Sequence, residues 1–136
     1  MHFFYDSTNL MLMVLALLAG GLLAWPALTR KRTTLPAAQV THLINKNNAI
    51  VIDVRTDSAF AQGHLPHAKH IPLDQLASKV AHLARDKNTP LVVVCQTGVQ
   101  SARAVNTIKQ AGYTQVFDLE GGLFAWQKMG LPLATK

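Results

Sequence analysis

The stretch LVVVCQTGVQSARA, residues 91–104, decides the fold and contains Cys95, the only cysteine of the chain. It opens with four consecutive apolar residues after a proline, three of them β-branched, which predicts a buried strand of a parallel sheet. From Ser101 onward the pattern predicts a helix. The chain should therefore pass from a strand through the loop of residues 95–100 into a helix, with Cys95 first in the loop.

This placement of Cys95 favours a nucleophile. A lone cysteine is more often a small buried hydrophobe, but a strand, a glycine-containing loop and a helix start aim successive backbone N–H groups at one point. The helix N-terminus adds partial positive charge there. Such donors stabilise a thiolate, the reactive form of cysteine. The loop residues expected to supply them are Gln96, Thr97, Gly98, Val99 and Gln100.

The rest of the chain after residue 35 alternates helical and extended patterns. We expect helices over residues 36–45, 58–62, 73–85 and 123–129, strands over 49–54 and 116–119, and a brief extended segment over 69–72. This alternation predicts an α/β domain with a mostly parallel sheet and helices on both faces. Ligands of such sheets bind beyond the carboxyl ends of the strands, where Cys95 and residues 53–55 fall.

The N-terminal part has a different composition. Residues 10–28 carry no charge and would form roughly 28 Å of helix, enough to cross a bilayer. Arg30, Lys31 and Arg32 follow directly, whereas Asp6 precedes the run, so the positive-inside bias places the N-terminus outside and the rest in the cytoplasm. A cleaved signal peptide is the alternative, but it would want its positive charge before the apolar run.

The expected organisation is therefore that of a single-pass protein of a bacterial-type inner (plasma) membrane. Residues 1–9 form a short extracytoplasmic N-terminus, 10–28 a transmembrane helix, 29–35 a basic juxtamembrane linker, and 36–136 the α/β domain. The net charge of +6 owes much to the juxtamembrane residues, and no basic stripe predicts nucleic-acid binding. One cysteine excludes an intrachain disulfide and agrees with a reducing compartment.

Four motifs in order resemble those of the single-domain rhodaneses, over nearly all of residues 35–132. They are IDVR at 52–55, FAQGHLPHA at 60–68, VCQTGVQSA at 94–102 and LEGGLFAW at 119–126. The resemblance implies the rhodanese fold and a sulfurtransferase in which Cys95 takes sulfane sulfur as a persulfide from a small donor such as thiosulfate. The persulfide then passes to an acceptor thiol or protein that the sequence does not identify, and neither a metal nor an organic cofactor is required.

Loop length distinguishes this chain from related phosphatases. Phosphatases of the cell-division-cycle type use a longer loop that fits a phosphate, with arginine six positions after the cysteine, and this chain has Ser101 at that position. The shorter loop resembles the sulfur-handling version, because a smaller ring of N–H groups suits a sulfur atom better than a phosphoryl group.

The loop departs from the family pattern at Gln96 and Gln100, where many members carry arginine. Each glutamine removes a cation that could hold thiosulfate, although Arg55 and Arg103 could partly restore it. The alternative function is thus a weakly active or inactive rhodanese scaffold that binds a partner protein at the membrane. Ser58 also stands where family members often carry an acidic partner of Arg55, so either Asp57 takes that role or Arg55 is freer.

The remaining polar residues have structural interpretations. Asp53 is expected to pair with Arg55 and accept loop N–H groups, and Ser101 to cap the helix or donate near the sulfur. The histidines recur at a regular spacing, but intervening prolines keep them off one helix face, so a zinc site is disfavoured. The aromatic pair near the C-terminus is expected in the core. These residues are His64, His67, His70, Phe124 and Trp126.

Overall fold

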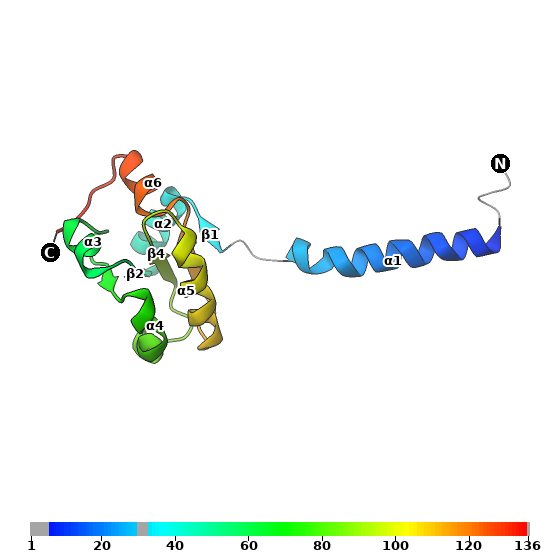
Figure 1. Cartoon of the computed structure of the whole chain (residues 1–136), viewed down its shortest axis with the longest axis horizontal. Coiled ribbons are helices and arrows are strands. Elements are labelled where there is room, and N and C mark those ends of the chain that lie inside the picture. Colours follow the sequence, from blue (N-terminus) through cyan, green and yellow to red (C-terminus); the bar gives the residue numbers. More distant parts are fainter. Residues whose placement is uncertain (1–5, 30–32, 136) are drawn as a thin grey trace. The chain divides into compact units, whose positions relative to one another are not determined.

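The computed structural model describes residues 6–29 and 33–135. The chain divides into two units, Met1–Arg32 and Thr33–Lys136 (Figure 1). Helix α1 (Ser7–Thr29) belongs to the first unit, and all the other elements belong to the second. The two units are described separately below.

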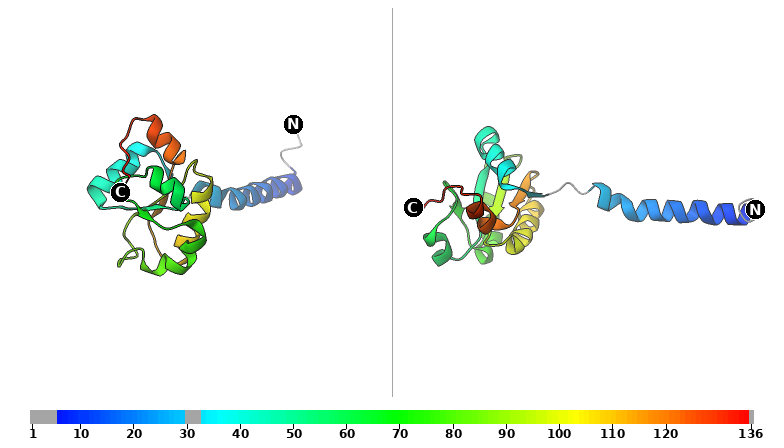
Figure 2. Two further views of the ribbon diagram at one scale, coloured as in Figure 1. Left: turned by 60° about the vertical axis from the view of Figure 1, so that its left-hand side comes forward. Right: turned by 90° about the horizontal axis from the view of Figure 1, so that it is seen from above.

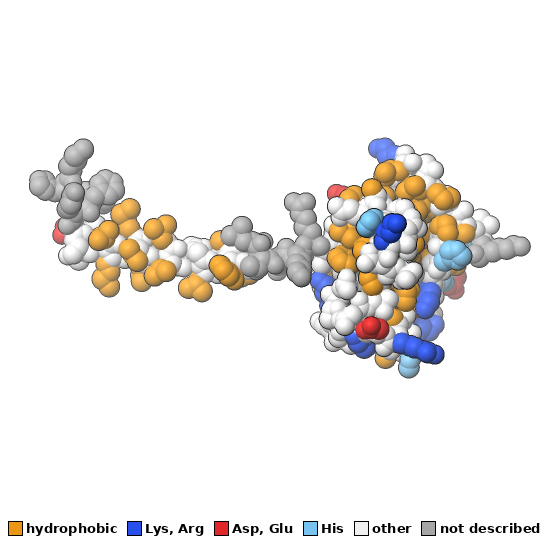
Figure 3. All heavy atoms as spheres, turned by 180° about the vertical axis from the view of Figure 1, so that it is seen from behind, with side chains coloured by type: hydrophobic (Ala, Val, Ile, Leu, Met, Phe, Trp, Pro, Cys, Tyr) orange, Lys and Arg blue, Asp and Glu red, His pale blue; other side chains and the backbone are white. Residues whose placement is uncertain are grey.

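Helix α1 has no polar face along residues 10–26, and apolar side chains gather along the side of it that Figure 3 shows. It extends the predicted apolar run at both ends, and its residues Ser7–Pro26 are long and apolar enough to cross a membrane. None of that window is buried within the protein. A helix that is hydrophobic all round needs an apolar environment, and membrane anchors and signal sequences share this length and composition.

The second unit is built on a five-stranded parallel sheet of order β1-β5-β4-β2-β3. The strands are β1 (Thr34–Leu35), β2 (Ile50–Asp53), β3 (Lys69–His70), β4 (Leu91–Val94) and β5 (Val116–Leu119). Strand β4 is central and completely buried, as its continuous apolar run predicts. The α/β class with a mostly parallel sheet is confirmed.

Helices cover both faces of this sheet (Figures 1 and 2). They are α2 (Ala37–Asn47), α3 (Asp57–Gln62), α4 (Leu73–Lys79), α5 (Val99–Gln110) and α6 (Gly122–Lys128). Side chains of α4 and α5 pack with Val93 in one core cluster, whereas those of α2 and α6 pack with Val92 and Val94 in the other. The side chains of successive β4 residues thus point to opposite faces of the sheet. Both faces are covered, so every position of the strand is buried and apolar.

Most predicted boundaries differ from the structure by one or two residues, and three of the differences bear on the site or the fold. Thr34 and Leu35, assigned to the linker, form the edge strand β1, because Asp118 N–H donates to the Thr33 carbonyl and Glu120 N–H to that of Leu35. Two residues are too few for a periodic pattern to show. Helix α5 begins at Val99 and not at Ser101, so the loop is shorter than predicted.

The helix predicted over residues 73–85 is also wrong in its second half. Helix α4 ends at Lys79 and a 3-10 turn, η2 (Val80–His82), follows. The buried hydroxyl of Tyr113 donates to the Val80 carbonyl at 2.9 Å and accepts from Ala84 N–H at 3.3 Å. It thereby intercepts the bond that an α-helix would make between these two groups. Tyr113 lies 29 residues after Ala84 in the sequence, so the residue pattern around 73–85 does not show that the helix is interrupted.

Candidate active site

Cys95 lies at the carboxyl end of the central strand. It follows Val94, the last residue of β4, whose register partner on β2 is Asp53. The residue is only 1% exposed, and its Sγ atom accepts a hydrogen bond from Gly98 N–H at 2.9 Å. The sulfur therefore accepts a backbone hydrogen bond at the carboxyl ends of the parallel strands, where sheets of this class bind their ligands.

Gly98 makes the turn that allows this hydrogen bond. Its φ of 95° lies in the left-handed region, which side chains other than glycine rarely adopt. Gly98 is also the N-cap of α5, so Val99 and Gln100 are the first helical residues. The N–H groups of a first helical turn have no intrahelical partner. The helix start thus carries unsatisfied donors in the segment that directly follows Gly98.

The Gly121-Gly122 turn supports the cysteine loop from its other side. A side chain on Gly122 would collide with the Cys95 carbonyl oxygen and lie 2.8 Å from the Gln96 carbonyl carbon. The close approach lets Leu123 N–H donate to the Cys95 carbonyl at 2.8 Å and Phe124 N–H to the Gln96 carbonyl at 3.2 Å. The start of α6 therefore holds the backbone of Cys95 and Gln96 through a contact that only glycine permits.

Asp53 and Arg55 form a buried ion pair beside the loop, which confirms the predicted pairing. Arg55 Nη2 donates to the Asp53 carboxylate at 2.7 Å and Nε donates to it at 3.0 Å. The same Nη2 donates to the Gly63 carbonyl at 2.6 Å, and Nη1 contacts the Gln96 side-chain oxygen at 3.4 Å. Arg55 does not use Asp57, whose exposed carboxylate lies 3.5 Å from His70.

A polar pocket of about 270 Å³ opens next to this pair. Arg55 and Gln96 contribute to its wall, and Ala59 and Leu123 are its apolar side chains. The complete lining is Arg55, Ala59, Gln62, Gly63, Gln96, Leu123 and Gln127. The pocket thus offers one guanidinium and three amide side chains, a set that suits a small polar or anionic molecule.

The other predicted site residues divide into a buried and an exposed group. Ser101 is completely buried and its hydroxyl donates to the Gly98 carbonyl at 2.9 Å, so it supports the turn and does not cap the helix. Gln96, Thr97, Val99, Gln100 and Arg103 are exposed. In the described part of the chain, no side-chain bond ties Arg103 to the loop.

Asp118 and Thr34 lie near the site, and no motif or pattern in the sequence predicts that they do. Asp118 on β5 is 5% exposed and accepts from the Thr34 hydroxyl at 3.0 and 3.2 Å. Its Oδ2 also lies 3.5 Å from the Ser101 hydroxyl. Thr34 and Asp118 are 84 residues apart, and only the pairing of β1 with β5 brings them together.

His64 and His70 pack against Phe60, whereas His67 is exposed. His64 is buried, stacks on Phe60 at 3.8 Å between ring centroids, and its Nδ1 lies 3.0 Å from the Phe60 carbonyl. His70 stacks on the same ring, and its Nε2 lies 2.8 Å from the Arg55 carbonyl. Within residues 6–29 and 33–135, no three metal-binding side chains come together. Trp126 is in the core as expected, whereas Phe124 is 61% exposed and the prediction for it is wrong.

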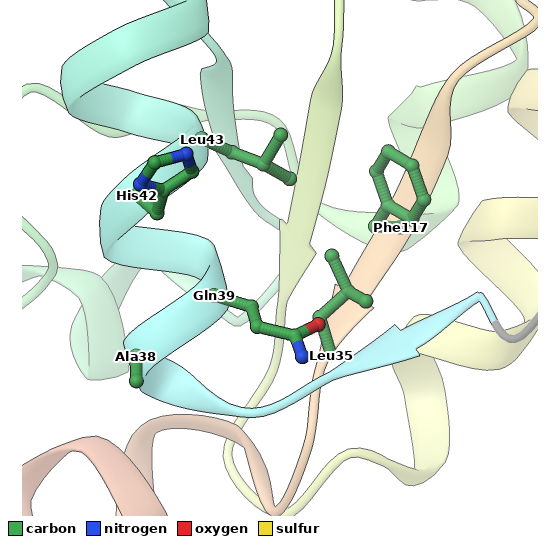
Figure 4. A pocket seen from close by; sticks show the side chains of 6 residues that line it. All are labelled: Leu35, Ala38, Gln39, His42, Leu43 and Phe117. Carbon is green, nitrogen blue, oxygen red and sulfur yellow. The ribbon is translucent and has the colours of Figure 1, made fainter.

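A second hollow, of about 430 Å³, lies away from this chemistry between α2, β1 and β5 (Figure 4). Leu35 and Phe117 form one side, and Ala38, Gln39, His42 and Leu43 of α2 form the other (Figure 4). It is lined mainly by apolar atoms and contains no nucleophile. We therefore place the candidate active site at Cys95.

The family model of the rhodanese-like domain matches residues 36–129. The chain belongs to the rhodanese family. It is 34% identical over 108 residues to the uncharacterized protein YibN of Escherichia coli, with 79% of this chain and 76% of that protein covered. It is also 34% identical over 93 residues to the thiosulfate sulfurtransferase GlpE of Pseudomonas aeruginosa, with coverages of 68% and 83%.

A solved structure supports the same assignment. The crystal structure of a rhodanese-related protein from Thermoplasma volcanium superposes with a TM-score of 0.69 at 30% sequence identity. It covers 78% of this chain and 100% of that one. The rhodanese fold and the membership of a family with named sulfurtransferases are therefore established on sequence and on structure.

Proposed function

We propose that this rhodanese is a membrane-anchored sulfurtransferase that moves sulfane sulfur through a persulfide on Cys95. The observation that carries the proposal is the 2.9 Å hydrogen bond from Gly98 N–H to Cys95 Sγ at the carboxyl end of the central strand. A backbone donor aimed at sulfur stabilises a thiolate and, later, the charge on a leaving thiolate.

The reaction has two steps, the transfer of sulfur from the donor to Cys95 and its transfer from Cys95 to an acceptor. The Cys95 thiolate attacks the outer sulfur of thiosulfate, the sulfur–sulfur bond of the donor breaks, and its electron pair leaves with sulfite. The cysteine then carries one additional sulfur as a persulfide. An acceptor thiolate or cyanide attacks that terminal sulfur, which forms a persulfide or thiocyanate and regenerates the Cys95 thiolate.

Backbone groups have the main role in this proposal. In the proposal, the other backbone N–H groups of the segment Gln96 to Gln100 join Gly98 N–H, which donates to the Cys95 sulfur, in holding the persulfide. The polar pocket at Arg55 and Gln96 would bind the donor's oxygen atoms through Arg55 and the three glutamines of its lining. Arg55 shares its charge with Asp53, so its attraction for an anion is reduced. Thiosulfate turnover should therefore be slow compared with a loop that carries its own arginine.

Helix α1 supplies the membrane anchor in this proposal. Its apolar circumference, the three basic residues at 30–32 and the acid at position 6 favour an N-terminus outside and a cytoplasmic rhodanese domain. A cytoplasmic location keeps a lone reactive cysteine in a reducing compartment.

A second candidate is a rhodanese scaffold that binds a partner protein at the membrane with little turnover. Two observations favour it: the loop residues Gln96 to Gln100 carry no charge, and one large apolar residue within the loop and another on α6 are exposed. Val99 is 77% and Phe124 61% exposed. Exposed apolar side chains around a reactive centre are a feature of protein-binding surfaces.

Mass spectrometry distinguishes these functions. Full-length protein in detergent is incubated with thiosulfate, and Cys95 is expected to gain the mass of one sulfur atom, which cyanide then removes as thiocyanate. Cys95→Ser should show neither the adduct nor turnover. Equal thiocyanate rates in the two proteins, or no adduct on the wild type, would favour the scaffold.

Topology is tested separately. A reporter fused after residue 136 should respond as a cytoplasmic protein, and the full chain should resist carbonate extraction. Neutral residues at 30–32 together with lysines around Asp6 should invert or scramble the orientation. An external reporter with the native sequence, or a mature chain without residues 1–28, would contradict the anchor.

A further inference from the structure

Asp118 is a buried carboxylate that the proposed sulfur transfer does not use. It is 5% exposed, and among the described residues its side-chain hydrogen-bond donors are the hydroxyls of Thr34 and Ser101. No salt bridge neutralises it within that part of the chain. A buried charge without a cation is unfavourable unless its hydrogen bonds are satisfied. The hydroxyls of Thr34 and Ser101 therefore stabilise the buried Asp118 carboxylate.

The Ser101 hydroxyl has one proton and two acceptors within reach. The Gly98 carbonyl lies at 2.9 Å and the Asp118 carboxylate at 3.5 Å. A hydroxyl donates a single hydrogen bond. The proton therefore goes to Gly98 only as long as the carboxylate, the stronger acceptor, is satisfied by another donor.

Thr34 is that other donor. Its hydroxyl lies 3.0 and 3.2 Å from the two carboxylate oxygens of Asp118, nearer than Ser101. Gly98, whose carbonyl Ser101 then holds, is the residue whose N–H donates to Cys95 Sγ. Since a glycine at φ 95° has wide conformational freedom, a bond on its carbonyl restricts the orientation of the N–H as well.

We propose that Thr34, Asp118 and Ser101 form a positioning network that keeps the Gly98 N–H directed at the Cys95 sulfur. Thr34 satisfies Asp118, and Ser101 is thereby left to hold the turn. Thr34 lies on β1, outside the residues 36–129 that match the family model, so a segment beyond the matched domain completes the site. The proposal rests on Cys95 as the nucleophile.

The network makes an unusual prediction about pairs of substitutions. Thr34→Val should release Asp118 to take the proton of Ser101, and the Gly98 carbonyl should lose its donor. Replacing the competing acceptor as well, in Thr34→Val with Asp118→Leu, should return that proton to Gly98. The bond between the exposed Thr34 and the buried Asp118 is part-buried, and substitution of both partners of a hydrogen bond by apolar groups is often nearly neutral. Asp118→Leu should therefore restore the bond from Ser101 to the Gly98 carbonyl that Thr34→Val removes.

The test uses full-length protein in detergent, with thiosulfate and cyanide as probes. Thr34→Val and Ser101→Ala should each lower kcat about tenfold and leave the KM for thiosulfate within about twofold, because the donor pocket is untouched. Thr34→Ser keeps the hydroxyl and should resemble the wild type. The pair Thr34→Val with Asp118→Leu should recover most of the lost kcat.

Thr41→Val is the matched control, since the Thr41 hydroxyl donates to the Ala37 carbonyl on α2 and takes no part in the network. The rate of Cys95 alkylation by iodoacetamide is measured in parallel and should fall in Thr34→Val and Ser101→Ala. This readout does not depend on sulfur transfer, so an inert wild type would contradict the proposed function while alkylation still tests the network. Unchanged rates in Thr34→Val, a KM effect alone, or a pair worse than the single change would overturn it.

Discussion

The cysteine loop and the Asp53–Arg55 corner lie next to each other, but they are held together by different interactions. In the loop, Cys95 Sγ and two carbonyls are bound by backbone N–H groups, and the exposed side chains from Gln96 to Gln100 carry no charge. At the corner, two full charges are buried, and Arg55 makes several short side-chain bonds.

The difference indicates that charge and reactivity are separated in this rhodanese. Asp53 and Arg55 neutralise each other and hold the turn at Gly63, whereas the Cys95 sulfur accepts a backbone N–H. Dipoles fixed by the backbone need no counterion and are already oriented for a thiolate. The following predictions test how far this separation extends.

The largest effect should come from a change in backbone approach and not in charge. Gly122→Ala places a methyl group against the Cys95 carbonyl and Gln96 carbonyl, and the loop must move. Displacement of a reacting group by about 1 Å can cost about a hundredfold in rate, so sulfur transfer should fall at least that far. Gly130→Ala is the control, because Gly130 has a similar φ of 71° with nothing within 4 Å. Equal losses in both variants would show that strain alone is responsible.

The next largest effect should be on stability, at the corner. Arg55→Gln leaves the Asp53 carboxylate buried without its cation, which should lower the free energy of unfolding by about 3–5 kcal/mol. The pair Asp53→Asn with Arg55→Gln should lose less than Arg55→Gln alone, since no charge is left unpaired. Urea unfolding of the rhodanese domain measures both. Arg103→Gln, at an exposed position, should change stability by less than about 0.5 kcal/mol.

A smaller effect is expected when charge is added to the loop. Gln100→Arg introduces a cation at the exposed start of α5 and should raise kcat/KM for thiosulfate about fivefold. Gln96→Arg is the matched variant: it places a second cation beside Arg55 Nη1, which Gln96 now contacts at 3.4 Å. Like-charge repulsion should cancel the gain or reverse it. If both variants improve equally, Arg55 does not limit the charge that the pocket accepts.

The smallest effect concerns salt. Because the loop is neutral and Arg55 is paired with Asp53, the wild-type kcat/KM for thiosulfate should change less than about twofold between low and physiological ionic strength. Gln100→Arg should become clearly more sensitive to salt, since its gain comes from an exposed charge. Parallel salt dependence in the two proteins would contradict a neutral loop.

Local pattern was sufficient for much of the architecture. The continuous apolar runs of β2 and β4 and the limits of β5 are predicted from the sequence, as is the place of Cys95 at the end of a buried strand. The Asp53–Arg55 pair was also within reach, because the two residues are adjacent in sequence and share one buried turn. The start of α5 was placed two residues late, because Val99 and Gln100 have no strong signal of their own.

Contacts between distant segments could not be predicted in this way. Tyr113 ends α4 by bonding across 33 residues, and Thr34 reaches Asp118 only because β1 pairs with β5. The two-residue strand β1 lacks any periodicity, and Asp118 is a single polar residue within the short apolar run of β5. No property of either residue by itself indicates the partner.

The sequence by itself determined the α/β class, the apolar N-terminal helix, the place of Cys95 directly after a buried strand and the family, since each depends on residues close together along the chain. The tertiary structure alone decided how the site is supported. It turned Arg55 toward Asp53 and Gly63, brought Gly122 against the Cys95 carbonyl, and placed Thr34, Asp118 and Ser101 around the turn at Gly98. These contacts join residues that are far apart along the chain. They form only after the parallel strands have paired in register.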